Sequence, residues 1–244
     1  MRTLAVTELL DVWERGQSEP PLRRALLLLA AACDDVSAER VVEWSVGQRD
    51  AALLRLRERQ FGPNLASRTS CPECREQVEF QLRCGDLLQP APALADGVLS
   101  AEWGEWKAEF RLPASSDLEA LDPHAAPERN RRLLLSRCVR SLHRGGAAVT
   151  VDELPAELGT LVAARMAGAD PHAELRLDFT CPACGHRWQA LLDVVSYFWT
   201  ELHGWAVRLL RDVHALASAY GWSEADILAL TARRRQLYLG FLRE

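Results

Sequence analysis

The sequence predicts an α+β fold that is mainly helical, with a helical part at each end of the chain and a split ribbon of strands joining them. Three observations predict this fold. Runs of strong helix formers with apolar residues every three or four positions occupy both ends of the chain. A C-P-x-C motif occurs twice, and apolar residues alternate with polar ones after each copy. The long segment between the two copies contains both patterns, so it is expected to be a mixed α/β insertion.

The N-terminal helical region is expected to span residues 1–66. The run PLRRALLLLAAAC begins at Pro21, and proline is tolerated in the first turn of a helix. The run GQRDAALLRLRERQF places apolar residues beside arginine and glutamate, as in an amphipathic helix, and Gly62–Pro63 follows as a stop signal.

The ribbon is expected in two halves, residues 67–84 and 174–193, each containing a tight cysteine turn that leads into a half-buried strand. The cysteines are Cys71 and Cys74 in the first half and Cys181 and Cys184 in the second. The alternating apolar residues are Val78, Phe80 and Leu82 in the first half, and Leu175, Leu177, Phe179, Trp188, Ala190 and Leu192 in the second.

Two facing turns of this kind supply four thiolates, the ligand set of a single structural Zn²⁺ ion. The fold class is therefore a split zinc ribbon between two helical parts, and the metal would fix how those parts meet. Substitution of Cys181 by serine is then expected to unfold the chain. The alternative for C-x-x-C is redox chemistry of the thioredoxin kind, but that needs one motif at the start of a helix. His186 could replace a cysteine as a ligand, but its place two residues after Cys184 favours a position beside the metal or on the surface.

The insertion is expected to span residues 85–173. It opens with a proline-rich loop, residues 88–97, and continues with a strand whose buried face carries Trp106 and Phe110. Ser115 or Ser116 is expected to cap a helix that begins near Asp117. Two more helices are expected, one from Arg131 to His143 and one before Asp170–Pro171.

The C-terminal helical region, residues 194–244, contains the clearest helical pattern in the chain. Gly221 is expected to end the long helix, and Ser223 and Thr231 are expected to start two short ones. Its apolar stripe consists of Val195, Phe198, Leu202, Trp205, Leu209, Val213, Leu216 and Tyr220.

Composition excludes several function classes. The chain has 244 residues and a formal net charge of −5, which argues against general binding to nucleic-acid phosphates. Its longest apolar run, Ala25 to Cys33, is too short to span a bilayer. Cys33, Cys84 and Cys138 are expected to be buried thiols, as in a protein of the reducing cytosol. No nucleophile–base set or phosphate-binding loop is evident, so we expect neither an enzyme nor a small-molecule substrate. His203 and His214 are expected on a helix surface.

Several runs together resemble the T-even-type phage baseplate hub assembly chaperone family. They extend from Val46 to Leu239, and the part around Tyr220–Ile227 is the most specific; residues 1–40 show no resemblance. The runs are VGQRDAALLRLRERQFG, CPEC, RLPASSDL, LLLSRCV, CPACGHRW and DVHALASAYGWSEADILALTARRRQLYL.

The resemblance implies a non-enzymatic assembly factor, or a minor structural component, of the baseplate hub of a contractile phage tail or phage-derived injection system. Its partner would be a hub, spike or tape-measure protein. It would act in the cytoplasm during assembly and then either leave or stay in the particle.

The contact with that partner is expected on the last helix, through an arginine-rich, amphipathic surface that would face an acidic patch. Its residues are Arg233, Arg234, Arg235, Tyr238 and Phe241. Two other functions remain open. The run GWSEADILALTARRRQLYL could form a helix-turn-helix of a zinc-ribbon nucleic-acid-binding protein, and the cysteines could serve an oxidoreductase.

Overall fold

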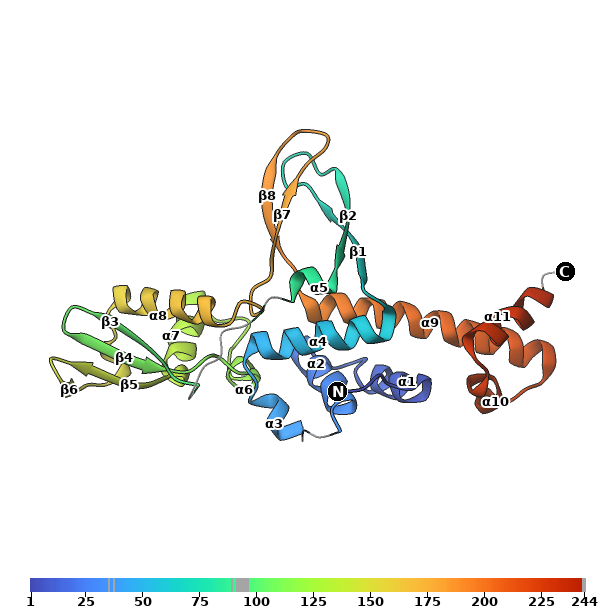
Figure 1. Ribbon diagram of the computed structural model, residues 1–244, viewed down its shortest axis with the longest axis horizontal. Coiled ribbons are helices and arrows are strands. Elements are labelled where there is room, and N and C mark those ends of the chain that lie inside the picture. The colour runs from blue at the N-terminus through green and yellow to red at the C-terminus, as the bar shows by residue number, and fades with distance from the viewer. Residues whose placement is uncertain (35, 37, 89, 91–96, 243–244) are drawn as a thin grey trace.

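The computed structural model describes residues 1–34, 36, 38–88, 90 and 97–242. It confirms a mainly helical α+β protein, in which a helical body carries three projections: an arm of strands, the insertion, and a lobe at the C-terminal end (Figure 1). Of the proline-rich loop predicted over residues 88–97, only residues 88, 90 and 97 lie within the described part of the chain.

The body forms because three of the four N-terminal helices bury their apolar faces against the first half of one long C-terminal helix, α9 (Val194–Tyr220), while the third, a short helix, packs on the second. Leu28, Leu53 and Phe198 are fully buried at the centre of this core. The N-terminal helices are α1 (Val6–Arg15), α2 (Pro21–Ala32), α3 (Ala38–Val42) and α4 (Val46–Phe61).

Helix α9 confirms the predicted apolar stripe and its end point. Its N-terminus is capped by Asp193, which accepts a hydrogen bond of 3.0 Å from the amide of Ser196. It ends at Gly221, whose left-handed backbone (φ 68°) is the conformation that glycine adopts most readily. Six of the eight stripe residues are buried, whereas Trp205 is half-buried and Tyr220 is 36% exposed.

The second half of α9 leaves the body and carries α10 (Glu224–Ala229) and α11 (Ala232–Phe241), which are capped by Ser223 and Thr231 as predicted. We call residues 205–242 the C-terminal lobe. A small core of its own holds it together, made by apolar residues of all three helices and Leu10 of α1. In Figure 1 the lobe lies at the opposite end of the molecule from the insertion.

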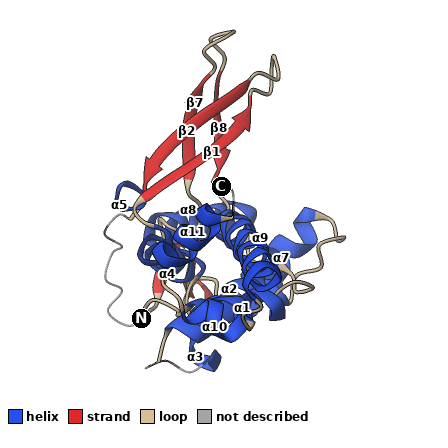
Figure 2. Ribbon diagram, turned by 90° about the vertical axis from the view of Figure 1, so that its right-hand side faces the viewer, coloured by secondary structure: helices blue, strands red, loops and turns tan. Residues whose placement is uncertain are grey.

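The arm consists of two antiparallel hairpins that stand side by side on the body (Figures 1 and 2). The predicted alternation is confirmed, since every second residue along each strand is half-buried or buried. Phe80 and Phe179 meet across the hairpins with ring centroids 5.1 Å apart, and Leu65 anchors the base of the arm in the body core. The strands are β1 (Asn64–Ser70), β2 (Gln77–Arg83), β7 (Arg176–Thr180) and β8 (Arg187–Leu191), and the short helix α5 (Cys84–Leu87) follows β2.

The insertion packs helix α8 against a four-stranded antiparallel sheet, with Phe110, Leu142 and Leu158 in its core. It joins the body where Asp170 accepts a hydrogen bond of 2.9 Å from the amide of Gly47, at the start of α4. Its strands are β3 (Leu99–Trp103), β4 (Trp106–Phe110), β5 (Val139–Arg144) and β6 (Ala147–Ala148). Its helices are α6 (Ser115–Glu119), α7 (Pro127–Cys138), the 3₁₀ turn Val151–Glu153 and α8 (Ala156–Ala169).

Two details predicted for the insertion are wrong. The helix expected from Arg131 to His143 ends at Cys138, because the residues that follow pair with β4 as strand β5. The helix expected near Asp117 begins at Ser115, and neither serine caps it. Instead, the buried Asp117 carboxylate accepts a hydrogen bond of 2.9 Å from the amide of Ala114, the residue before the helix.

The sequence predicts that a metal fixes how the two helical parts meet; the structure shows that the parts also meet by direct packing. Helices α4 and α9 pack directly against each other within the body core. A bidentate ion pair reinforces that contact, since Arg57 of α4 donates two hydrogen bonds of 2.6 Å to Glu201 of α9. The cysteines lie elsewhere, in the turns at the far end of the arm (Figure 1).

Candidate metal centre

The two C-P-x-C motifs fold into turns with the same backbone hydrogen bonds. In the first, the amide of Cys71 donates to the carbonyl of Glu76, and the carbonyl of Cys71 accepts from Arg75, both at 2.9 Å. In the second, the amide of Cys181 donates to His186 and its carbonyl accepts from Gly185, again at 2.9 Å. Each turn closes one hairpin, so the pairing of the hairpins brings the turns face to face.

The four predicted sulfurs form one cluster, in which all four lie within 4.8 Å of one another. The short contacts join one turn to the other: the Sγ atoms of Cys71 and Cys184 lie 3.7 Å apart, and those of Cys74 and Cys181 lie 3.5 Å apart. A tetrahedral zinc site with Zn–S bonds of about 2.3 Å has sulfur–sulfur edges of about 3.8 Å. The cluster is therefore compatible with a Zn²⁺ site in its size and in its ligand chemistry.

The electrostatics of the cluster also favour a cation. The amides of Cys184 and Ala183 donate to the Cys181 sulfur and lower the pKa of that thiol to about 7. At Cys74 the amide of Glu76 acts in the same direction, but interactions with Cys184, burial, and contacts with the other thiols outweigh it and raise the pKa to about 12. Adjacent thiolates repel one another, so a divalent cation is needed for all four to ionise together.

Burial within the cluster is asymmetric. The first cysteine of each pair, Cys71 or Cys181, is buried, and the second, Cys74 or Cys184, is exposed. His186 is not part of the cluster; its ring stacks on Trp188 with centroids 6.1 Å apart, while its backbone amide hydrogen-bonds the sulfur of Cys184.

The other three cysteines, Cys33, Cys84 and Cys138, are buried as predicted. Burial raises the pKa of Cys84, and it raises that of Cys138 to about 11, so both are held as neutral thiols at physiological pH.

The five residues predicted to contact a partner do not share one surface. Arg233 and Arg234 are exposed and Phe241 is 59% exposed, but Arg235 is only 6% exposed and faces α9. Tyr238 is half-buried and packs edge-on against Trp222, at 4.9 Å between centroids. The position of Arg235 also weakens the helix-turn-helix alternative, because an arginine that faces α9 is not on the outer face of α11, where it would have to lie to contact a DNA backbone.

Sequence reasoning missed a group of buried polar residues at the joint between insertion and body. His172 is 3% exposed, and its Nε2 has no hydrogen-bond partner among the described residues. Asp50 of α4 is 9% exposed and pairs with Arg49 at 2.7 Å. Burial raises the pKa of Asp50 and lowers that of His172. No motif marks these residues, and the turn signal at Asp170–Pro171 is the only local indication of them.

A mainly helical α+β protein with a four-cysteine cluster on a projecting arm is compatible with many roles, and comparison with known proteins narrows them. The chain belongs to the T4 bacteriophage base plate protein family, whose sequence model matches residues 7–199. The match begins well before Val46 and ends before Tyr220–Ile227, so the run expected to be most specific lies outside it. Comparisons with curated proteins and with solved structures returned no match. Within the described part of the chain, no helix has the length and apolar character needed to cross a bilayer.

Proposed function

We propose that the protein is a non-enzymatic assembly factor or minor structural component of the baseplate hub of a contractile phage tail or a phage-derived injection system. Membership of the base plate protein family carries this proposal, because the match covers the insertion, both hairpins of the arm and most of the body. The partner would be a hub, spike or tape-measure protein, met in the cytoplasm during assembly.

A single structural zinc ion bound by Cys71, Cys74, Cys181 and Cys184 completes the proposal. Support comes from the sulfur spacing and from the backbone amides that hydrogen-bond the sulfurs. The ion would tie the two hairpins together at their tips, whereas Phe80 and Phe179 join them lower down. The arm would then be a rigid projection whose outer faces could bind another protein.

The shape of the molecule supports a role in binding other proteins. The arm, the insertion and the C-terminal lobe extend in different directions from the body and offer separate surfaces (Figure 1). Helix α11 also exposes large apolar side chains to solvent: Leu237 is 55% exposed and Phe241 is 59% exposed. Exposed apolar clusters of this kind are typical of docking surfaces.

The test is assembly of tail particles from the reconstituted gene cluster, with and without this chain. We expect loss of the protein to abolish or strongly reduce complete baseplates. A chain truncated after Leu230 keeps the family-matched region but lacks α11, and it is expected to reduce assembly if the lobe binds the partner. Normal assembly without the whole protein would refute the proposed role. Mass spectrometry of purified particles then shows whether the protein stays in them.

A further inference from the structure

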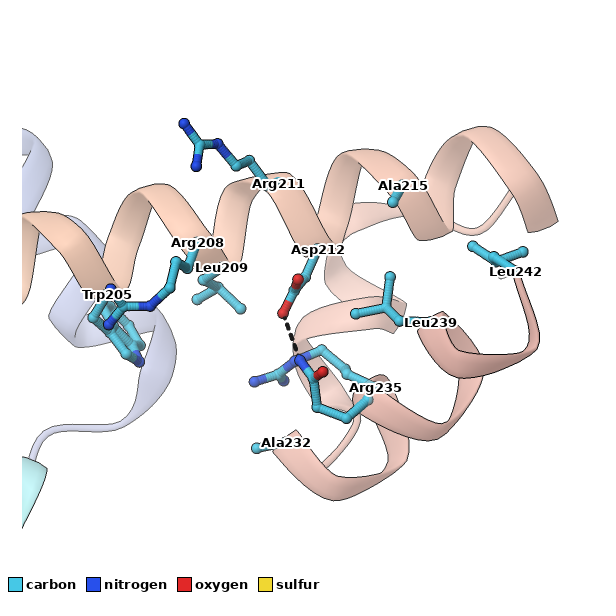
Figure 3. A pocket seen from close by; sticks show the side chains of 11 residues that line it. Trp205, Arg208, Leu209, Arg211, Asp212, Ala215, Ala232, Arg235, Leu239 and Leu242 are labelled. Carbon is cyan, nitrogen blue, oxygen red and sulfur yellow. Dashed lines mark hydrogen bonds between the residues drawn. The ribbon is translucent and has the colours of Figure 1, made fainter. Parts of the chain in front are cut away.

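A groove of about 730 Å³ runs between α9 and α11 in the C-terminal lobe. Figure 3 shows Trp205 at one end and Leu242 at the other, with Arg235 reaching from α11 into the space between the helices. Leu209 and Leu239, both less than 10% exposed, form its apolar floor. The groove lies beyond the family match, which ends at residue 199.

The charge in this groove is unbalanced. Arg235 is 6% exposed, and its one side-chain hydrogen bond goes to the carbonyl of Leu230, at 2.7 Å. Among the described residues, no carboxylate lies within ion-pair distance of Arg235, nor of Arg208 and Arg211, which also line the groove. Among the described residues that line the groove, the only acidic one is Asp212, and the amide group of Gln236 donates to it at 3.0 Å.

A buried arginine without a counter-charge favours the binding of an anionic partner. A guanidinium group stays protonated in proteins, and its burial away from water is unfavourable unless a negative charge compensates it. Its planar fork matches a carboxylate in two parallel hydrogen bonds, which are among the strongest in proteins. The chain as a whole carries a net charge of −5, so the positive charge of the groove is a local feature and does not reflect the overall composition.

We propose that this groove receives an acidic amphipathic helix of another protein. Apolar side chains of that helix would cover Leu242 and the partly exposed ring of Trp205. A carboxylate beside them would pair with Arg235, and a second one would reach Arg208. Binding of an amphipathic helix in a groove between two helices is a common mode of recognition. The inference deepens the proposed role of the C-terminal lobe, because it states the chemistry of the partner and moves the contact from the outer face of α11 to its inner face.

The probe is a fluorescently labelled synthetic helix of about 20 residues, with leucines on one face and glutamates on the other. Its counterpart has lysines in place of the glutamates. We expect saturable binding of the glutamate helix to the full chain, measured by fluorescence anisotropy, and no binding of the lysine helix. Arg235→Gln should weaken binding about tenfold or more, since it removes a desolvated charge pair. Arg208→Gln, a change at an exposed residue of the same groove, should weaken binding less.

The matched control is Arg234→Gln, which removes the same charge from an exposed position of α11 outside the groove and should leave binding unchanged. Circular dichroism establishes that each variant is folded. If Arg235→Gln disturbs the fold of the lobe, the Arg208→Gln variant and the comparison of the two probe helices still test whether the groove binds an acidic helix. The inference is overturned if the glutamate helix fails to bind, if both helices bind equally, or if Arg234→Gln weakens binding as much as the groove variants. Because the assay uses the isolated chain, its result is independent of whether tail particles need the protein.

Discussion

Arg75 and Gly185 occupy equivalent positions in the two cysteine turns, and both have left-handed backbone, with φ of 63° and 73°. Each follows the second cysteine of its pair and donates its amide to the carbonyl of the first. Glycine adopts this conformation without steric cost, whereas a side chain is strained there by about 1 kcal/mol. Arg75 is the only described residue other than glycine with a positive φ, so the first turn is the strained half of the centre.

The first prediction follows from this asymmetry. Arg75→Gly relieves the strain but adds backbone entropy to the unfolded chain, so it should leave the stability of the arm unchanged or raise it by less than about 1 kcal/mol. Gly185→Ala introduces the strain into the second turn and should lower arm stability by about 1 kcal/mol. Competition with a metal chelator measures both variants as changes in zinc affinity. If the two substitutions changed zinc affinity by the same amount, the strain assigned to Arg75 and its absence at Gly185 would both be wrong.

The second prediction concerns removal of the metal. We expect one zinc ion per chain by elemental analysis, and its loss on chelation or in Cys181→Ser. The sequence alone led us to expect unfolding of the whole chain, but the body core contains none of the four cysteines. Loss of zinc should therefore disorder the outer half of the arm and leave the helical signal and the main melting transition almost unchanged.

Limited proteolysis measures this local effect, with new cleavage expected between residues 68 and 80 and between 178 and 189. Cys138→Ser is the control, since this buried cysteine lies in the insertion and not in the cluster. A chain that holds two zinc ions, or none, would contradict the proposed centre. A chain that loses its whole cooperative transition on chelation would contradict the separation of arm and body.

The long helix and the strands of the arm were predictable because their signals are local. Eight apolar residues at helical spacing define one face of α9, and alternation within seven residues defines a strand. Strand β5 was missed because Cys138, Val139 and Leu142 also fit a helical spacing, and only pairing with β4 selects the strand. Burial of Arg235 was equally unpredictable, since the inner face of α11 is determined by how that helix packs on α9.

The third prediction is a pH dependence at the joint between insertion and body. Burial of His172, together with the charge of Arg55, lowers the pKa of this imidazole below its ordinary value of 6.5. The folded state thus favours neutral His172, with the carboxylate of Asp170 opposing the shift only in part. The resulting stability is fully present above about pH 6.5, the unfolded pKa, and is lost as pH falls below it, because the unfolded chain then binds the proton more readily.

Thermal melting at about pH 8 and about pH 5.5 measures this effect. We expect the melting temperature of the wild-type chain to fall on acidification. His172→Phe removes the titrating group and should reduce that fall. An identical pH profile in wild type and variant would show that His172 does not contribute.

The fourth prediction tests what holds the two helical parts together. Arg57 has a side chain only 3% exposed, and it forms two hydrogen bonds of 2.6 Å with Glu201, whose carboxylate also accepts from the hydroxyl of Tyr197 at 3.2 Å. Glu201→Gln leaves the buried guanidinium without its counter-charge, and removal of one partner from a buried pair typically costs about 3 kcal/mol. We expect this loss in the free energy of unfolding of the body, measured by urea denaturation.

The matched control is Glu105→Gln, which breaks the ion pair between Arg144 and Glu105 in the insertion. Both side chains of that pair are more than half exposed, so water and salt already screen the interaction, and the expected loss is below about 1 kcal/mol. Because Glu201 lies in α9 and Arg57 in α4, the Glu201→Gln variant should lose body stability while it keeps its zinc. Cys181→Ser should instead lose its zinc while it keeps the stability of the body. If the two variants instead lowered the same transition by the same amount, the arm and the body would form one cooperative unit, and the metal would after all contribute to joining the two ends of the chain.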